Sequence, residues 1–185
     1  MVFPARWRSP EPADEPTHRK THPTKVGMHA RLAYGITGPM SDEQIHLLRK
    51  TFVALEAEGH VAALVFYQRL FALDPSLRPL FKIGIEEQSR KLMDMLGLAV
   101  SLSAAPAALD TELCQLGARH ATYGVRAEHY KTVGQAMSEM LAEVLGPEFT
   151  PPVQDAWASF YTLMAETMKR GASPAAAQPT TVTAQ

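Results

Sequence analysis

Residues 150–168 read TPPVQDAWASFYTLMAETM and carry the clearest helix signal in the chain. Thr150 is a suitable N-cap, and Pro151 fits the first helical turn because the N–H that it lacks has no partner there. Apolar side chains then recur at helical spacing, which predicts one inward-facing side. That side consists of Val153, Trp157, Phe160, Tyr161, Met164 and Met168.

The segments before this helix show the same periodicity, and none shows the alternation typical of a β-strand. Ser41 and Gln44 form a capping box, and Gly59 breaks the first helical pattern. The next pattern ends near Asp74, because Pro75 disfavours helical geometry in the residue before it. The apolar faces expected for these two helices are Ile45, Leu48, Phe52 and Leu55, and then Val61, Leu64, Tyr67, Leu70 and Phe71.

Three more helices are expected between these and the last. One follows Gly84, one runs from near Asp110 to Gly124, and one ends at Gly146. The sequence therefore predicts an all-α fold of six or seven helices with short connections. The inward faces expected for the first and third of these helices are Gln88, Leu92, Met95, Leu96 and Ala99, and then Tyr130, Val133, Met137, Leu141 and Leu145.

Charge and proline divide the 185 residues into one domain and two tails. Residues 1–40 hold six of the 14 prolines and six Lys or Arg against three Asp or Glu, so we expect a disordered basic arm. Residues 171–185 carry no charged side chain and few apolar ones, and we expect a disordered tail. The domain is then 41–170, which is long enough for one sizeable core.

Composition excludes several classes of protein. A net charge of -1 gives no reason to expect nucleic-acid binding. Cys114 is the only cysteine, which excludes an intramolecular disulfide and a cysteine-held metal cluster. The sequence shows no secretory signal and no membrane-spanning run, so we expect a cytoplasmic protein.

His120, in the segment LGARHATYGV at 116–125, is the strongest candidate for a functional residue. Its imidazole can donate one ring N–H to a carbonyl one turn earlier, which leaves the other nitrogen facing the interior. Without a second His or a Cys in a nearby motif, zinc is excluded. A buried hydrogen bond, a catalytic role and axial ligation of a haem iron remain open. Leu116 and Gly117 would suit the close approach of a flat apolar group.

Four residues offer the other half of such a site. Gln88 and Leu92 share a helix face, and Tyr67 lies between apolar neighbours that direct its hydroxyl inward. Phe81 follows a proline-containing turn and could stack on a porphyrin. Taken singly, Tyr67 and Phe81 are equally consistent with the core, and Gln88 with an exposed position.

The order of short motifs along residues 41 to 170 resembles the bacterial single-domain haemoglobins and the globin domain of flavohaemoglobins. This resemblance implies a globin fold around one haem b. The motifs are Phe66-Tyr67, Leu80-Phe81, Gln88-Ser89-Arg90-Lys91-Leu92-Met93, His120, Tyr123-Gly124-Val125, His129-Tyr130, Val133-Gly134-Gln135 and Ala156-Trp157.

The resemblance also implies residue roles. His120 matches the proximal iron ligand, and Phe81 matches the phenylalanine that stacks on the porphyrin. The residues that match the ligand side and the rest of the haem pocket are Tyr67, Gln88 and Leu92 on the distal side, Leu116, Val125, Tyr130 and Val133 as pocket positions, Trp157 in helix packing, and Arg119 and Lys91 as candidate propionate partners.

One departure from the flavohaemoglobin pattern concerns the proximal side. In those relatives the tyrosine matched by Tyr130 and a late glutamate make the proximal histidine more anionic, which favours oxygen activation. Here the glutamate position aligns with Gly171-Ala172, and Glu166 comes too early. No segment after residue 170 could bind FAD or a nicotinamide, so a built-in reductase is not expected.

The resemblance leaves three functions open. The first is reversible, high-affinity binding of dioxygen, with NO and CO as further ligands and oxygen transport as a role. The second is nitric oxide dioxygenation that depends on a separate reductase. The third is a haem-based sensor or a partner-binding globin, for which the basic arm could meet an anionic surface.

Overall fold

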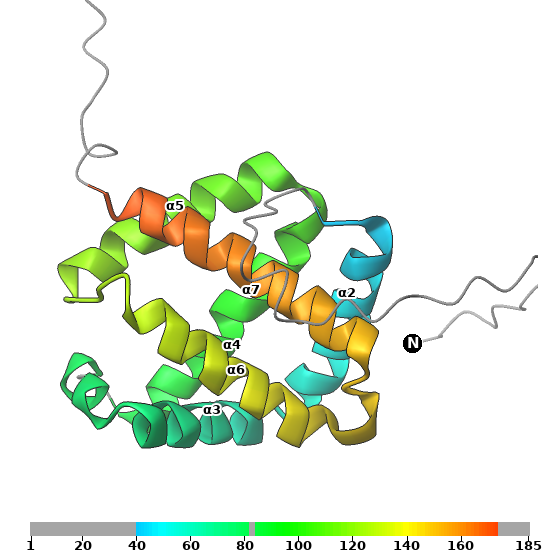
Figure 1. Cartoon of the computed structure of the whole chain (residues 1–185), viewed down its shortest axis with the longest axis horizontal. Helices are drawn as coiled ribbons and strands as arrows, with labels where there is room; N and C mark the ends of the chain where they lie inside the picture. Colours follow the sequence, from blue (N-terminus) through cyan, green and yellow to red (C-terminus); the bar gives the residue numbers. More distant parts are fainter. Residues whose placement is uncertain (1–39, 82–83, 174–185) are drawn as a thin grey trace, which may run out of the picture. The chain divides into compact units, whose positions relative to one another are not determined.

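The computed structural model describes residues 40–81 and 84–173, all within the compact unit Ile36–Gln185. These residues form helices and no strand, which confirms the all-α prediction (Figure 1). The expected basic arm and tail lie almost wholly outside the described residues. The elements are α2 (Asp42–Ala57), α3 (Gly59–Leu73), η1 (Pro75–Leu80), α4 (Ile85–Ser101), η2 (Leu102–Ala104), α5 (Pro106–Thr122), α6 (His129–Leu145), η3 (Gly146–Glu148) and α7 (Pro151–Gly171), where η is a 3-10 helix.

The start signals read from the sequence account for two of the helices. The Ser41 hydroxyl accepts from the Gln44 backbone N–H at 3.2 Å, and the Gln44 side chain accepts from the Ser41 N–H at 3.0 Å. The capping box of α2 is therefore confirmed. Thr150 is the N-cap of α7 and Pro151 opens the helix, although the Thr150 side chain makes no capping hydrogen bond.

Two predictions about helix bounds and buried faces were wrong. Helix α5 begins at Pro106 rather than near Asp110, because Pro106 supplies the first helical position without needing a hydrogen-bond partner. On α3, Val61 and Leu64 are exposed, whereas Ala62, Ala63, Val65 and Phe66 are buried with Tyr67 and Leu70. Most positions of α3 are apolar, so its periodicity could not select the buried side.

Helix α7 holds the domain together through α5 and α2 (Figure 1). The Trp157 indole donates to the buried Thr51 hydroxyl of α2 at 3.0 Å. Two glycines bring α5 and α7 into backbone contact: a Cβ on Gly117 would lie 2.0 Å from the Met168 carbonyl oxygen, and one on Gly171 would lie 2.1 Å from that of Cys114. The close approach at Gly117 thus accommodates α7, and the expectation that it admits a flat ligand was wrong.

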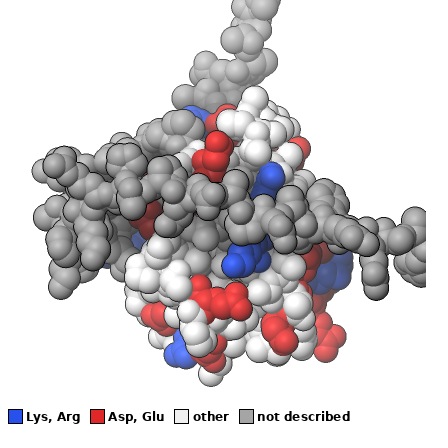
Figure 2. All heavy atoms as spheres, turned by 90° about the vertical axis from the view of Figure 1, so that its right-hand side faces the viewer, with Lys and Arg blue, Asp and Glu red and all other residues white. Residues whose placement is uncertain are grey.

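Helices α4 and α5 are joined by η2 and make few direct contacts, whereas α3 packs against both α6 and α4. This separation leaves room between α4 and α5. No helix among residues 40–81 and 84–173 is long and apolar enough to cross a membrane. On the face shown in Figure 2, acidic and basic side chains are interspersed with uncharged ones over its described part.

Candidate functional site

His120 lies in the last turn of α5 with its ring held by its own helix. Nδ1 is 2.9 Å from the Leu116 carbonyl oxygen. Because a carbonyl can only accept, Nδ1 carries the proton and Nε2 keeps a free lone pair. Burial lowers the pKa of this imidazole, the Leu116 bond opposes that shift, and Arg119 adds to it. The ring is therefore a neutral base with one nitrogen available, as the sequence predicted.

The end of α5 fixes the backbone at this histidine. Gly124 has a φ of 86°, a left-handed conformation that stops the helix and that glycine adopts without strain. The N–H groups of Tyr123 and Val125 both donate to the His120 carbonyl oxygen at 3.1 Å. This double contact holds the imidazole at a defined position.

Tyr67 of α3 is 5% exposed, and its hydroxyl donates to the backbone carbonyl of Gln88 on α4 at 3.3 Å. Its ring meets Phe81 edge to face, with centroids 5.4 Å apart. Burial raises the pKa of Tyr67 to about 12, so the hydroxyl remains a hydrogen-bond donor at neutral pH. The structure thus brings Tyr67, Phe81 and Gln88 together.

A cavity of about 360 Å³ lies among α3, η1 and α4, and we call it the α3–α4 cavity. Its lining consists of Leu64, Tyr67, Gln68, Phe71, Arg78, Phe81, Ile85 and Gln88.

A second cavity of about 280 Å³, the α4–α5 cleft, is lined by Lys91 and Met95 on one side and by Leu116 and Arg119 on the other. Both candidate propionate partners therefore face one cleft. Lys91 also pairs with Glu87 at 2.8 Å on the helix surface. His120 and Leu92 lie on the helices that flank the two cavities and are not among the lining residues of either.

Comparison with known proteins identifies the fold family. The Globin family profile matches residues 64–168. The chain belongs to the globin family. The globin is 28% identical over 130 residues to the flavohemoprotein of Vibrio cholerae and 34% identical over 131 residues to that of Bordetella pertussis. Each match covers 69% of this chain but only 33% and 32% of those proteins, so the globin spans about a third of their length.

Solved structures resemble the globin over the same region. An engineered carbene transferase, made from a Rhodothermus marinus protein described as a candidate nitric oxide dioxygenase, is 28% identical with a TM-score of 0.65, over 72% of this chain and 93% of that one. A Campylobacter jejuni globin is 22% identical with a TM-score of 0.63, over 71% and 96%. A hexacoordinated haem protein from a tardigrade is 18% identical with a TM-score of 0.66, over 72% and 96%. The last two matches show the fold alone.

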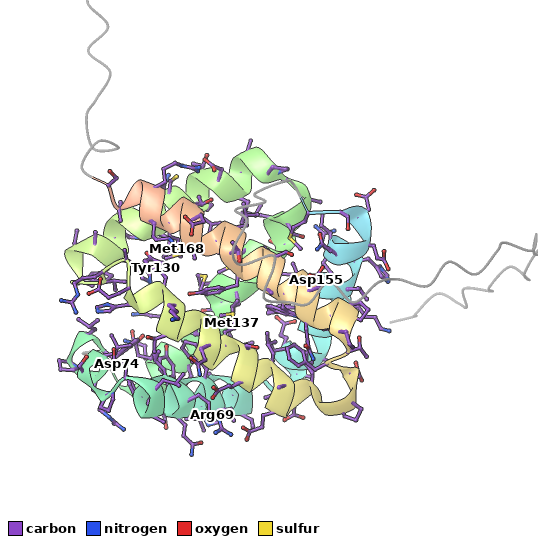
Figure 3. All side chains as sticks on the ribbon, in the orientation of Figure 1. Arg69, Asp74, Tyr130, Met137, Asp155 and Met168 are labelled. Carbon is purple, nitrogen blue, oxygen red and sulfur yellow. The ribbon has the colours of Figure 1, made fainter. Side chains whose placement is uncertain are left out.

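Membership of the globin family implies a haem, and the donor set of this globin fits that cofactor. The Nε2 of His120 keeps its lone pair, so it is a nitrogen donor of the kind that holds a haem iron. The Tyr130 hydroxyl is buried and has no hydrogen-bond partner in the part of the chain that the structure describes. It lies on the side of the domain where α7 ends near Met168 (Figure 3).

The resemblance to flavohaemoglobins placed their late glutamate at Gly171-Ala172, where α7 ends. Gly171 packs on the Cys114 carbonyl, so no side chain fits at that position. Glu166 is exposed and pairs with Lys169 at 2.5 Å. Val125 and Val133 are partly buried against the core.

Gln68 and Arg78 are two of the cavity residues of this globin that sequence analysis did not single out. Gln68 follows Tyr67 on α3, where the predicted apolar face implied exposure. Arg78 lies in η1, and its guanidinium carbon is 4.6 Å from the Phe71 ring centroid. Arg78 has no sequence signal of its own, because a short 3-10 turn has no periodicity that places a side chain. On α3 most positions are apolar, so the helical pattern did not place Gln68 at the cavity.

Proposed function

We propose that this globin binds haem b through His120 and reversibly binds dioxygen with high affinity. The observation that carries the proposal is that buried Tyr67 lines the same cavity as Gln88, while the Nε2 of His120 stays free. Haem would supply an iron atom able to take a diatomic ligand. Leu92, half-buried on the same face of α4 as Gln88, would complete the distal wall.

The role of the chain on the ligand side is to donate hydrogen bonds in a partly dry cavity. Bound dioxygen carries partial negative charge, so donors there favour it over the less polar carbon monoxide. Tyr67 is held by α3 and by its contact with the Gln88 carbonyl, and it loses little freedom when it turns to a ligand. Phe71 stacks on its ring and Phe81 meets it edge to face, so apolar groups lie on two sides of the tyrosine.

On the proximal side, three features support oxygen binding over strong oxygen activation. The Leu116 carbonyl that accepts from Nδ1 is neutral, so it makes the imidazole less anionic than a carboxylate acceptor would. Gly171 contacts the Cys114 backbone, so a glutamate side chain would not fit at that residue. The exposed Glu166 carboxylate forms an ion pair with Lys169. His120 therefore stays a neutral imidazole with modest electron donation.

Tyr67→Phe should raise the dioxygen dissociation rate about ten- to a hundred-fold. A hydrogen bond to a charged group contributes about 1.5–3 kcal/mol, and about 1.4 kcal/mol corresponds to ten-fold. Stopped-flow displacement of dioxygen measures the rate. Tyr123→Phe is the control, since it removes a hydroxyl from a 61% exposed ring and should leave the rate unchanged. A wild-type rate in Tyr67→Phe would rule out this role for the tyrosine.

Tyr130→Phe should leave the free energy of unfolding unchanged or raise it by about 1 kcal/mol, because its buried hydroxyl has no described partner. Tyr161→Phe is the matched comparison: the Tyr161 hydroxyl donates to the Tyr130 carbonyl, and its loss should cost about 1 kcal/mol. Urea denaturation of the haem-free protein measures both. Equal destabilisation by the two changes would contradict the prediction and would give the Tyr130 hydroxyl a partner.

The alternative function is nitric oxide dioxygenation with electrons from a separate reductase. Its support is the likeness to two flavohemoproteins and to a protein described as a candidate nitric oxide dioxygenase. Sustained consumption of NO in the presence of NADH and a generic flavin reductase would favour the enzyme. One equivalent consumed per haem would favour binding alone. Oxygen transport, a sensor role, a partner of the basic arm and a cytoplasmic location stay predictions.

A further inference from the structure

We propose that the α3–α4 cavity contains an anion-binding subsite at Arg78, where small monovalent inorganic anions of the size of azide or nitrate bind on their way to the ligand side. The inference deepens the proposed function and rests on it for its haem-based readout. It adds a charge preference to a cavity that would otherwise be expected to select uncharged diatomic molecules.

The first argument is the sign of the charges that line this cavity. Among the described residues that line this cavity, Arg78 is the one that carries a charge, and none of these described residues is a carboxylate. The other polar residues of the lining are Gln68, Gln88 and Tyr67. Both glutamine side-chain amides can donate a hydrogen bond, and the Tyr67 hydroxyl could donate to an anion in place of the Gln88 carbonyl. A cation together with several donors attracts an anion.

The second argument is that the charge of Arg78 is held at the cavity and is not neutralised. Its guanidinium carbon lies 4.6 Å from the Phe71 ring centroid, a cation–π contact that keeps the side chain against the cavity wall. Arg78 forms no ion pair with any residue within 40–81 and 84–173. The arginines that are paired there are Arg69, Arg90, Arg126 and Arg170.

The third argument is position. Phe71 and Phe81 meet edge to face at 5.3 Å, and Phe81 meets Tyr67 in the same way at 5.4 Å. The charged group is therefore linked to the Tyr67 hydroxyl through a continuous aromatic cluster. An anion at Arg78 would share one cavity with Tyr67 and Gln88 rather than occupy a separate surface site.

The test measures azide association with the ferric holoprotein by stopped-flow absorption at low and high ionic strength. Arg78→Gln should lower the azide association rate about three- to ten-fold at low ionic strength. The difference in rate between the variant and wild type should shrink as salt is added. The ratio of azide to carbon monoxide association rates, the latter for the ferrous protein, should fall by the same factor. Arg78→Lys should retain most of the wild-type azide rate.

Arg90→Gln is the matched control, because it removes the same charge from an exposed side chain of α4 that pairs with Asp94 outside the cavity. An equal loss of azide rate in Arg90→Gln and Arg78→Gln would overturn the proposal, since net charge alone would then explain it. An unchanged azide-to-carbon-monoxide ratio in Arg78→Gln would also overturn it.

A second measurement makes the proposal testable without haem. Nitrate titration of the haem-free protein, followed by NMR of the Gln68 and Gln88 side-chain amides, should shift those signals in wild type and not in Arg78→Gln. Absence of a shift in wild type would refute the subsite. Failure to bind haem would instead refute the proposed function, so the two failures can be distinguished.

Discussion

His120→Gly should bind haem more than about ten-fold more weakly than wild type and should lose the Soret absorption at haem concentrations that saturate wild type. Among the described histidines, the variant removes the one whose Nδ1 contacts its own helix, at 2.9 Å from the Leu116 carbonyl oxygen, and whose Nε2 is left free. Mutation of a group that only hydrogen-bonds to a metal ligand typically lowers metal affinity about ten- to a hundred-fold, and loss of the ligand itself should lower it more. Absorption titration with hemin measures the effect.

Added imidazole should restore the spectrum of His120→Gly, because it can occupy the space of the missing ring. His60→Gly is the control, since His60 is exposed at the start of α3. The rival ligand is His129, which is buried, but both of its ring nitrogens face Arg126, at 3.1 and 3.3 Å. Full haem binding by His120→Gly without imidazole, or its loss in His129→Ala, would contradict the assignment.

Gly117→Ala should lower the free energy of unfolding by about 2–3 kcal/mol, the upper part of the range for overpacking a core. The added Cβ would lie 2.0 Å from the Met168 carbonyl oxygen, and a backbone group cannot turn aside as a side chain can. Helix α5 would have to move away from α7, and His120 would move with it. Chemical denaturation of the haem-free protein measures the loss.

Gly97→Ala supplies the matched control. It places the same methyl group in the interior of α4, 3.4 Å from the edge of the Phe52 ring, which is ordinary contact. Alanine is favoured over glycine inside a helix by roughly 0.5–1 kcal/mol, so this variant should be as stable as wild type or slightly more so. Similar losses in the two variants would show that the backbone contact of Gly117 is not responsible.

The sequence could predict features that depend on neighbours in the chain. The capping box at Ser41 and Gln44 needs residues three apart, and the contact of His120 with Leu116 needs residues four apart on one helix. Proline and glycine likewise mark helix ends by their own backbone chemistry. Periodicity also located the buried face of the amphipathic helices, such as Leu48, Phe52 and Leu55 on α2.

Features that depend on contacts between distant segments could not be predicted in this way. Apolar side chains on nearly every turn of α3 hid its orientation, and Val61 and Leu64 were placed inward wrongly. Gly117 could admit either a ligand or another helix, and only the approach of Met168 decides between them. The grouping of Tyr67 with Gln88 across α3 and α4 was available through the family resemblance alone.

The paired glycines of α5 and α7 have a consequence for how ligand affinity can change in this globin. The backbones of α5 and α7 are in direct contact at Gly117 and at Gly171. Rotamer changes of core side chains therefore cannot change the position of α5 relative to α7. The histidine on α5 is consequently in a fixed location. Substitutions that adjust affinity without unfolding the domain should therefore be found on α3, η1 and α4, where side chains alone define the cavity.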